Sequence, residues 1–135
     1  MQITRQADYA LRAMVYLSRL EPNQRAATKK IAEIQKIPPS FLAKIISQLS
    51  IAGLIHTSRG AHGGVVLSRP ASEISLLEVV EAIDGPIALN ECTIAPGSCE
   101  MAGDCPLHDI WQETQTELVD KLRKTRFDKY AIKAV

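Results

Sequence analysis

The sequence predicts a mostly α-helical fold that contains one small β-hairpin. Apolar residues recur every three to four positions over most of the chain, which is the spacing of amphipathic helices. Two short β-prone runs, residues 54–58 and 65–68, flank a glycine-rich turn, as the strands of a hairpin do. A long helical pattern resumes only after residues 86–106, a segment rich in proline and glycine. We therefore expect a helical body, a hairpin, and a separate C-terminal helix.

The first two helices are bounded by their flanking residues. An apolar stripe predicts the first helix over about residues 4–20, and Pro22-Asn23 ends it. Thr28 is expected to cap a short second helix that continues through Ile37. Pro38-Pro39 then breaks that helix, because proline cannot continue the hydrogen-bonded ladder.

The third helix is expected from about Ser40 to Ala52. Pro39 suits the first turn of a helix, and Gly53 is a natural stop. The helix has an apolar stripe that we expect to be buried, made of Phe41, Leu42, Ile45, Ile46 and Leu49. The opposite face carries small or hydrogen-bonding side chains, namely Ser40, Ala43, Lys44, Ser47 and Gln48.

The hairpin and the fourth helix follow from turn and capping signals. The hairpin tip, residues 59–64, is basic and contains three glycines, which supply the backbone freedom of a sharp turn. Ser75-Leu76-Leu77-Glu78 is a capping-box sequence that opens a helix to Ile83. Asp84-Gly85-Pro86 closes it.

Residues 86–106 are expected to be a loop, and all three cysteines lie in it. A loop of this length inside a compact domain is usually functional or disordered. From Leu107 the last helix has one apolar stripe, made of Ile110, Trp111, Thr114, Leu118 and Leu122. We therefore divide the chain into a first domain that ends with the fourth helix (1–85), a cysteine loop (86–106), and a long helix with a C-terminal tail (107–135).

Composition and charge limit the function classes. The 135-residue chain has no apolar run near the ~18–20 residues that span a bilayer, and its first residues lack the apolar core of a secretory signal. We expect a cytoplasmic protein with no membrane partner. Residues 1–70 carry ten basic and three acidic residues, whereas residues 71–135 carry six basic and twelve acidic ones. This asymmetry predicts a polyanion as partner of the first half.

Three short helices followed by a hairpin are the order of a winged helix-turn-helix. Lys44 and Gln48 lie one turn apart on the third helix and can reach base edges or phosphates in a major groove. The hairpin tip offers cations and bare glycine amides to a phosphate strand or a minor groove. The predicted DNA-contacting set is Ser40, Phe41, Lys44, Ser47, Gln48, Arg59, Gly60, His62, Gly63 and Gly64.

The cysteine run Cys92-x6-Cys99-x5-Cys105-x2-His108 predicts a metal centre. Thiolates select soft metals, namely zinc, copper(I) or iron in iron–sulfur clusters. Gaps of six and five residues exceed those of zinc fingers and favour a larger iron–sulfur cluster. A structural zinc, a thiol or disulfide switch and three unrelated free cysteines are the alternatives. His108, an acidic group or an exogenous ligand must complete the site. We see no nucleophile–base arrangement and no phosphate loop, so we expect no enzyme.

These residues together resemble the Rrf-two family of bacterial transcription regulators, which includes IscR, NsrR and RirA. The resemblance extends over nearly the whole chain and ends with the three-cysteine loop and the long C-terminal helix. Its motifs are Met1-Gln2-Ile3-Thr4, Asp8-Tyr9-Ala10-Leu11-Arg12, Ile31-Ala32-Glu33, Ile37-Pro38, Phe41-Leu42-Ala43-Lys44-Ile45, Ala52-Gly53-Leu54-Ile55, Arg59-Gly60 with Gly63-Gly64, and Ser75-Leu76-Leu77-Glu78-Val79-Val80.

The resemblance implies a homodimer of winged-helix subunits that reads a palindromic operator. Residues 1–85 would then be the winged-helix DNA-binding domain, and the long helix in residues 107–135 would be a dimerisation helix that crosses its partner. It also implies a 2Fe–2S or 4Fe–4S cluster in the loop, whose loss or oxidation changes operator affinity. IscR-like members use a histidine as fourth ligand, as at His108, whereas NsrR-like members use an aspartate of the other subunit's first helix, as at Asp8. The first gap has six residues where IscR has five. The fourth ligand is therefore either His108 or the partner subunit's Asp8.

Overall fold

The computed structural model describes residues 2–93, 95, 97, 100–101 and 103–131. Its elements, in chain order, are α1 (Arg5–Ser18), α2 (Thr28–Gln35), α3 (Pro39–Ile51), β1 (Ile55–Ser58), β2 (Gly64–Leu67), the 3-10 turn η1 (Ala71–Glu73), α4 (Leu76–Asp84), the 3-10 turn η2 (Glu91–Thr93), α5 (His108–Lys124) and the 3-10 turn η4 (Phe127–Tyr130). The predicted mostly helical fold with one hairpin is confirmed.

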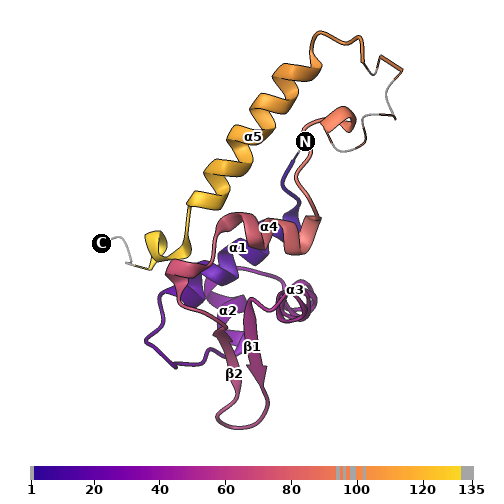
Figure 1. Cartoon of the computed structure of the whole chain (residues 1–135). Coiled ribbons are helices and arrows are strands. Elements are labelled where there is room, and N and C mark those ends of the chain that lie inside the picture. Colours follow the sequence, from indigo (N-terminus) through magenta and orange to yellow (C-terminus); the bar gives the residue numbers. More distant parts are fainter. Residues whose placement is uncertain (1, 94, 96, 98–99, 102, 132–135) are drawn as a thin grey trace.

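Helices α1–α4 form one body, and two elements project from it in opposite directions (Figure 1). The β1–β2 hairpin points away at one end. The long helix α5 extends from the other side, and the cysteine-containing segment connects its far end back to α4. A single apolar core holds the body together, with Met14, Ile31, Leu42, Ile45, Leu49 and Val79 among its most buried side chains.

The second helix begins and ends differently from the prediction. Thr28 is not the cap: Ala27 precedes the helix in extended conformation, and no side chain caps it. The physical reason is tertiary, because Ala26 pairs with Val65 in an antiparallel bridge and keeps the chain extended up to the helix. The helix ends at Gln35 rather than Ile37, because Lys36 adopts the left-handed conformation (φ 56°). Ile37 precedes a proline, which also disfavours helical backbone there.

The third helix spans Pro39–Ile51, one residue before the predicted Ser40–Ala52 at each end, and Gly53 after its C-cap has φ 77°. Its predicted buried stripe is correct at four positions, which are Leu42, Ile45, Ile46 and Leu49. Phe41 was wrongly placed in that stripe, since it is 41% exposed. Its ring lies in the first turn of α3 and meets the ring of Tyr9 edge-on, with 5.9 Å between centroids. Phe41 therefore packs beside α1 at the rim of the core.

Strands β1 and β2 pair antiparallel, with Ile55 opposite Leu67 and Ser58 opposite Gly64. Only the inward side chains are buried, as an exposed hairpin requires. Ala26, two residues before α2, pairs with the outer edge of β2. The Ala26 amide donates to the Val65 carbonyl at 3.0 Å, and the Val65 amide donates to the Ala26 carbonyl at 2.8 Å. The hairpin is thereby fixed to the helical body rather than hanging free.

The end of the chain returns to the body after α5. The Leu76 amide donates to the Thr125 carbonyl at 2.9 Å, and the Phe127 amide donates to the Ile74 carbonyl at 3.1 Å. Phe127 is fully buried in the same core as α1, α3 and α4. No local signal predicted this, because two aromatic residues, Phe127 and Tyr130, in a short polar tail are too few to show a periodic pattern.

Helix α5 is packed along only part of its length. Leu118, Val119 and Leu122 pack against a small cluster of Leu77, Val80 and Ile87. At its other end Leu107, Ile110 and Trp111 are exposed. Over the part of the chain that the structure describes, no helix is both long and apolar enough to cross a membrane.

Candidate nucleic-acid interface and cysteine segment

An open groove of about 690 Å³ lies between α3 and the hairpin. Helical spacing brings Ala43, Ser47 and Ser50 to one side of it, since residues four and three positions apart share a helix face. The hairpin forms the other side, with Arg59, Gly60, Gly63 and Gly64 among its lining residues. Small side chains on both walls leave room for a backbone strand to enter.

The predicted DNA-contacting residues fall into two groups. Ser47, Arg59, Gly60, Gly63 and Gly64 line the groove. The remaining five, Ser40, Phe41, Lys44, Gln48 and His62, do not line it. Of these, Ser40, Phe41, Lys44 and His62 are exposed, whereas Gln48 is half-buried and its Oε1 atom is buried without a hydrogen-bond partner. The exposed residues of α3 beside the groove extend the same surface.

Sequence reasoning missed four polar residues of the groove wall, namely Thr28, Ser50, Thr57 and Ser58. Ser50 could have been found, because it follows Ala43 and Ser47 at helical spacing. Ser58 has a further role that only the fold shows. Its hydroxyl lies 2.6 Å from Arg25 Nη1, so a cation from the segment before α2 is held against the hairpin.

Among the described residues, Arg59 is the one charged residue that lines the groove, and Lys44 is exposed on α3 outside it. The ion pairs between described residues join Arg12 to Asp8, Arg69 to Glu78 and Arg123 to Asp120. Lys44 and Arg59 are in none of these pairs, so their charges face the solvent without a carboxylate partner among the described residues. Unpaired cations around a groove of small residues are what phosphate contact requires.

The glycines of the hairpin tip are required by its geometry. A Cβ atom on Gly64, which has φ 147°, would lie 2.7 Å from the Ala26 carbonyl oxygen. A Cβ on Gly63 would collide with the backbone of Ser58 and Arg59. A side chain at Gly64 would push the hairpin away from Ala26, and one at Gly63 would distort the tip itself, so either would change the shape of the groove.

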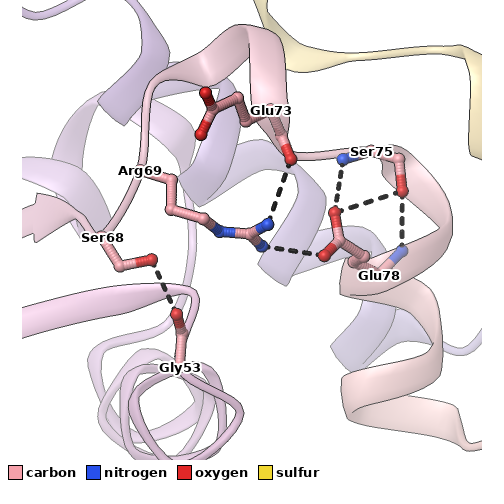
Figure 2. A network of polar contacts seen from close by, with 6 residues as sticks. All are labelled: Gly53, Ser68, Arg69, Glu73, Ser75 and Glu78. Atoms are coloured by element: carbon pink, nitrogen blue, oxygen red, sulfur yellow. Dashed lines mark hydrogen bonds and ion pairs between the residues drawn. The ribbon is translucent and has the colours of Figure 1, made fainter.

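The base of the hairpin is tied to α4 by a polar network (Figure 2). Arg69 Nη2 lies 2.8 Å from a Glu78 carboxylate oxygen, and Arg69 Nη1 donates to the Glu73 carbonyl at 3.2 Å. The Ser75 hydroxyl accepts from the Glu78 amide, and Glu78 accepts from the Ser75 amide, which confirms the predicted capping box.

The same network sets the pKa of Glu78. Partial burial raises the pKa of this carboxyl group, but the hydrogen bonds and charge of Arg69, together with the Ser75 amide, outweigh burial. The pKa of Glu78 is therefore lower than its ordinary value, and the carboxylate stays ionised at neutral pH.

The cysteine segment leaves the body at Gly85 and reaches α5 at His108. Cys92 lies in η2, and Cys105 lies shortly before α5; both are free thiols of intermediate burial. Cys99, the predicted middle ligand, lies outside the described residues. His108 is the first residue of α5. Asp8 lies on α1, where its carboxylate is 2.8 Å from Arg12 Nη2.

The described members of the predicted ligand set do not form a metal site in this structure. Among the described residues, no three His, Cys, Asp or Glu side chains converge closely enough to hold a metal ion. The donor chemistry nevertheless fits an iron–sulfur cluster, because two accessible thiols flank a segment whose third thiol is Cys99. Cys92, Cys99 and Cys105 would hold such a cluster, with one further ligand.

A helical body with a third helix, a groove that Arg59 lines and a glycine-tipped hairpin defines a winged-helix regulator of transcription. The comparisons with known proteins give the family. Residues 3–131 match the model of the Rrf2 family, described as an iron-dependent transcriptional regulator. The chain belongs to this family, as its resemblance predicted, and it is a transcription regulator rather than an enzyme.

Two relatives show how far the likeness extends. The chain is 35% identical over 126 residues to the HTH-type transcriptional regulator Rv1287 of Mycobacterium tuberculosis, covering 93% of this chain and 78% of that protein. It is 39% identical over 109 residues to protein aau3 of Rhizobium meliloti, covering 81% of this chain and 67% of that one.

Solved structures confirm the fold. CymR of B. subtilis, titled the global cysteine regulator, superposes with a TM-score of 0.80 at 23% identity, over 97% of this chain and 96% of that one. IscR of T. potens superposes with a TM-score of 0.76 at 21% identity, over 96% of this chain and 85% of that one. The oxidized form of Staphylococcus aureus CymR superposes with a TM-score of 0.79 at 26% identity, over 100% of this chain and 98% of that one.

Proposed function

We propose that this protein is a DNA-binding regulator that senses iron, redox or nitric oxide status through an iron–sulfur cluster. The cluster would be of the 2Fe–2S or 4Fe–4S type and held by Cys92, Cys99 and Cys105. Its fourth ligand would be either His108 or the partner subunit's Asp8. The observation that carries the proposal is the pair of free, partly exposed thiols at both described ends of the cysteine run, in a family described as iron-dependent.

The DNA-binding half of the proposal rests on the groove and the surface beside it. Helix α3 would lie in a major groove of DNA with its exposed residues Ser40, Lys44 and Ser47 facing the bases and phosphates. Gln48 would take part through its amide nitrogen, because its oxygen is buried. The tip, with Arg59, Gly60, His62, Gly63 and Gly64, would follow a phosphate strand into the adjacent minor groove. Phe41 would border this contact from the first turn of α3.

A homodimer would bring two such surfaces to a palindromic operator. The exposed apolar side chains at the start of α5 support this part of the proposal. Leu107 is 54% exposed and Ile110 is 49% exposed, and Trp111 lies beside them. Large apolar groups gathered on one projecting helix end are typical of a surface that a partner covers. A second copy crossing α5 would bury them.

The cysteine segment would transmit the signal because of where it is attached. It connects Gly85, at the end of α4, with the start of α5. Ligand binding by the three thiols would connect Cys92 to Cys105 through the cluster and fix the start of α5. A dimer fits two half-sites only when its recognition helices lie about one DNA turn, ~34 Å, apart. A small change in α5 would therefore change operator affinity.

A thiol switch is a second candidate. S. aureus CymR, 26% identical to this chain, has been solved in an oxidized form. In a switch of this kind, two thiols of the segment lose two electrons and two protons to an oxidant such as a peroxide and form a disulfide. A structural zinc bound by the same thiols is the remaining alternative.

Anaerobic purification tests these candidates together. An iron–sulfur protein would be coloured and would contain acid-labile sulfide with its iron. One zinc per chain without colour would support the structural metal instead. Metal-free protein whose operator binding changes on peroxide treatment and is restored by dithiothreitol would support the thiol switch. Metal-free protein that binds its operator equally under all conditions would contradict cluster sensing.

A further inference from the structure

We infer that Gln115 is a positioning residue that holds Cys92 near the start of α5. The Leu89 backbone amide donates to Gln115 Oε1 at 3.0 Å, across 26 positions of the sequence. Gln115 is half-buried, whereas each residue from Asp109 to Thr114 is exposed. This contact is therefore the point at which the cysteine segment is fastened to the projecting part of α5. The hydrogen bond itself is independent of the proposed function, but the role of positioning a cluster ligand rests on it.

A continuous series of contacts connects Gln115 to Cys92. Ile87 is buried against α4 and α5 just before the fastened residue. Asn90, directly after Leu89, organises η2: its carbonyl accepts from the Thr93 hydroxyl at 2.6 Å and from the Thr93 amide at 3.1 Å. Cys92 is the middle residue of that turn. Fastening Leu89 therefore fixes the turn that carries the thiol.

The helix geometry explains why this position matters. Gln115 lies seven residues after His108, which is about 10 Å along the axis of α5. Cys92 lies three residues beyond Leu89, a stretch that spans at most about 10 Å. The contact therefore leaves Cys92 within reach of the first turn of α5, beside which Cys105 lies. Without it, the segment beyond Ile87 would lose its register along the helix.

The chain offers a matched control on the same helix. Gln112 lies three residues before Gln115, is exposed, and has no side-chain hydrogen bond among the described residues. Gln115→Ala and Gln112→Ala therefore change helix propensity equally, but only the first removes the contact. Gln115→Glu keeps an acceptor of the same length, whereas Gln115→Asn is one methylene too short to reach.

Amide hydrogen exchange of the metal-free protein tests the contact directly. We expect exchange at Leu89 and in η2 to become roughly threefold to tenfold faster in Gln115→Ala and Gln115→Asn, as expected for one lost hydrogen bond. Gln115→Glu and Gln112→Ala should exchange like the wild type. Unchanged exchange in Gln115→Ala would overturn the inference.

Thiol cross-linking tests the positioning without any metal. In a Cys99→Ala background, Cys92 and Cys105 are the only cysteines, and bismaleimidoethane can join them within one chain. We expect intramolecular cross-linking to slow by about threefold or more in Gln115→Ala, in line with the lost hydrogen bond, and to recover in Gln115→Glu. An equal rate in wild type and Gln115→Ala would overturn the inference.

Iron and sulfide retention then links the contact to the proposed function. If the wild type binds iron and sulfide, Gln115→Ala should lose its iron to a chelator faster than Gln112→Ala does. Equal loss would overturn the proposed positioning role. If the wild type takes up no iron and sulfide, the cluster proposal fails, and the exchange and cross-linking results still decide the role of Gln115.

Discussion

The guanidinium of Arg69 lies 2.8 Å from the carboxylate of Glu78, and this ion pair joins the segment that follows the hairpin to the first turn of α4. Figure 2 shows that the same two residues also reach the backbone of Glu73 and Ser75. The position of the hairpin is thus tied to the helix whose end leads into the cysteine segment. The hairpin side of the groove and the cysteine segment are therefore both attached to α4.

Glu78→Gln should make stability less dependent on pH. Glutamine preserves the capping box, so the substitution removes mainly the ion pair, at a cost of about 0.5–1 kcal/mol at pH 7. Because the folded pKa of Glu78 is below its ordinary value of 4.5, this stabilisation is present above that value. It is lost as pH falls through the folded pKa.

Thermal unfolding between pH 7 and pH 3 measures this effect. The difference in melting temperature between wild type and Glu78→Gln should shrink below about pH 4.5. Glu81→Gln, an exposed position on the same helix, serves as the control and should show no such trend. A constant difference over the whole range would contradict the role of the ion pair.

Gly64→Ala should distort the hairpin more than Gly60→Ala. A Cβ at Gly64 would lie 2.7 Å from the Ala26 carbonyl oxygen, whereas one at Gly60 would meet open space. Both glycines have positive φ, so the comparison isolates the collision. We expect Gly64→Ala to cost about 1–3 kcal/mol more in unfolding free energy. Urea titration measures the unfolding free energy of both variants. Equal losses in the two variants would show that the close approach of Ala26 does not exclude a side chain at position 64.

Much of the fold could be predicted because its signals are local. The capping box at Ser75, the start of α3 at Pro39 and the hairpin turn each depend on neighbours in sequence. The errors arose where contacts between residues far apart in the sequence determine the local structure. Ala26 pairs with Val65 and so displaces the predicted cap at Thr28, and Phe41 lies against Tyr9 instead of in the core.

The residue types of the candidate site could be predicted from the sequence, but the contacts between its elements could not. Residue types and helical spacing indicated Ser47 and the glycine-rich tip, because both belong to single elements. Arg25 against Ser58 was missed, since a contact between a loop and a strand leaves no pattern in sequence. The same is true of Gln115 and Leu89, which belong to different predicted segments.

Phe127→Ala should destabilise the whole body. This side chain is fully buried in the core of the body, where its turn η4 packs against α1 and η1, and its removal would leave a cavity there. We expect a loss of about 3–5 kcal/mol in unfolding free energy. Phe41→Ala removes the same atoms from a site that is 41% exposed and should cost far less. Urea unfolding of both variants measures the difference, and similar costs would contradict the packing of the C-terminal turn.

Lys44→Ala should weaken operator binding. Lys44 is exposed on α3 and has no acidic partner among the described residues. Loss of a base contact should cost roughly 1–3 kcal/mol, whereas loss of a phosphate contact should lower the salt dependence by about one charge. Fluorescence anisotropy at several salt concentrations distinguishes the two.

The control for Lys44 is Lys124→Ala, which removes the same charge from the end of α5, away from the hairpin. Its binding curves should match those of the wild type. Equal weakening by both substitutions would mean that only net charge matters. No weakening by Lys44→Ala would remove this position from the interface.

Asp8→Ala and His108→Ala, purified anaerobically side by side, should identify the fourth ligand of a cluster. Asp8 lies on α1 in an ion pair with Arg12, whereas His108 begins α5, three residues after Cys105. Only the variant that lacks the true ligand should show changed visible absorbance and faster iron loss to a chelator. Asp109→Ala, at an exposed neighbouring position, is the control. If both variants retain the wild-type spectrum and stability, neither side chain is the ligand, and water or a small molecule occupies that position.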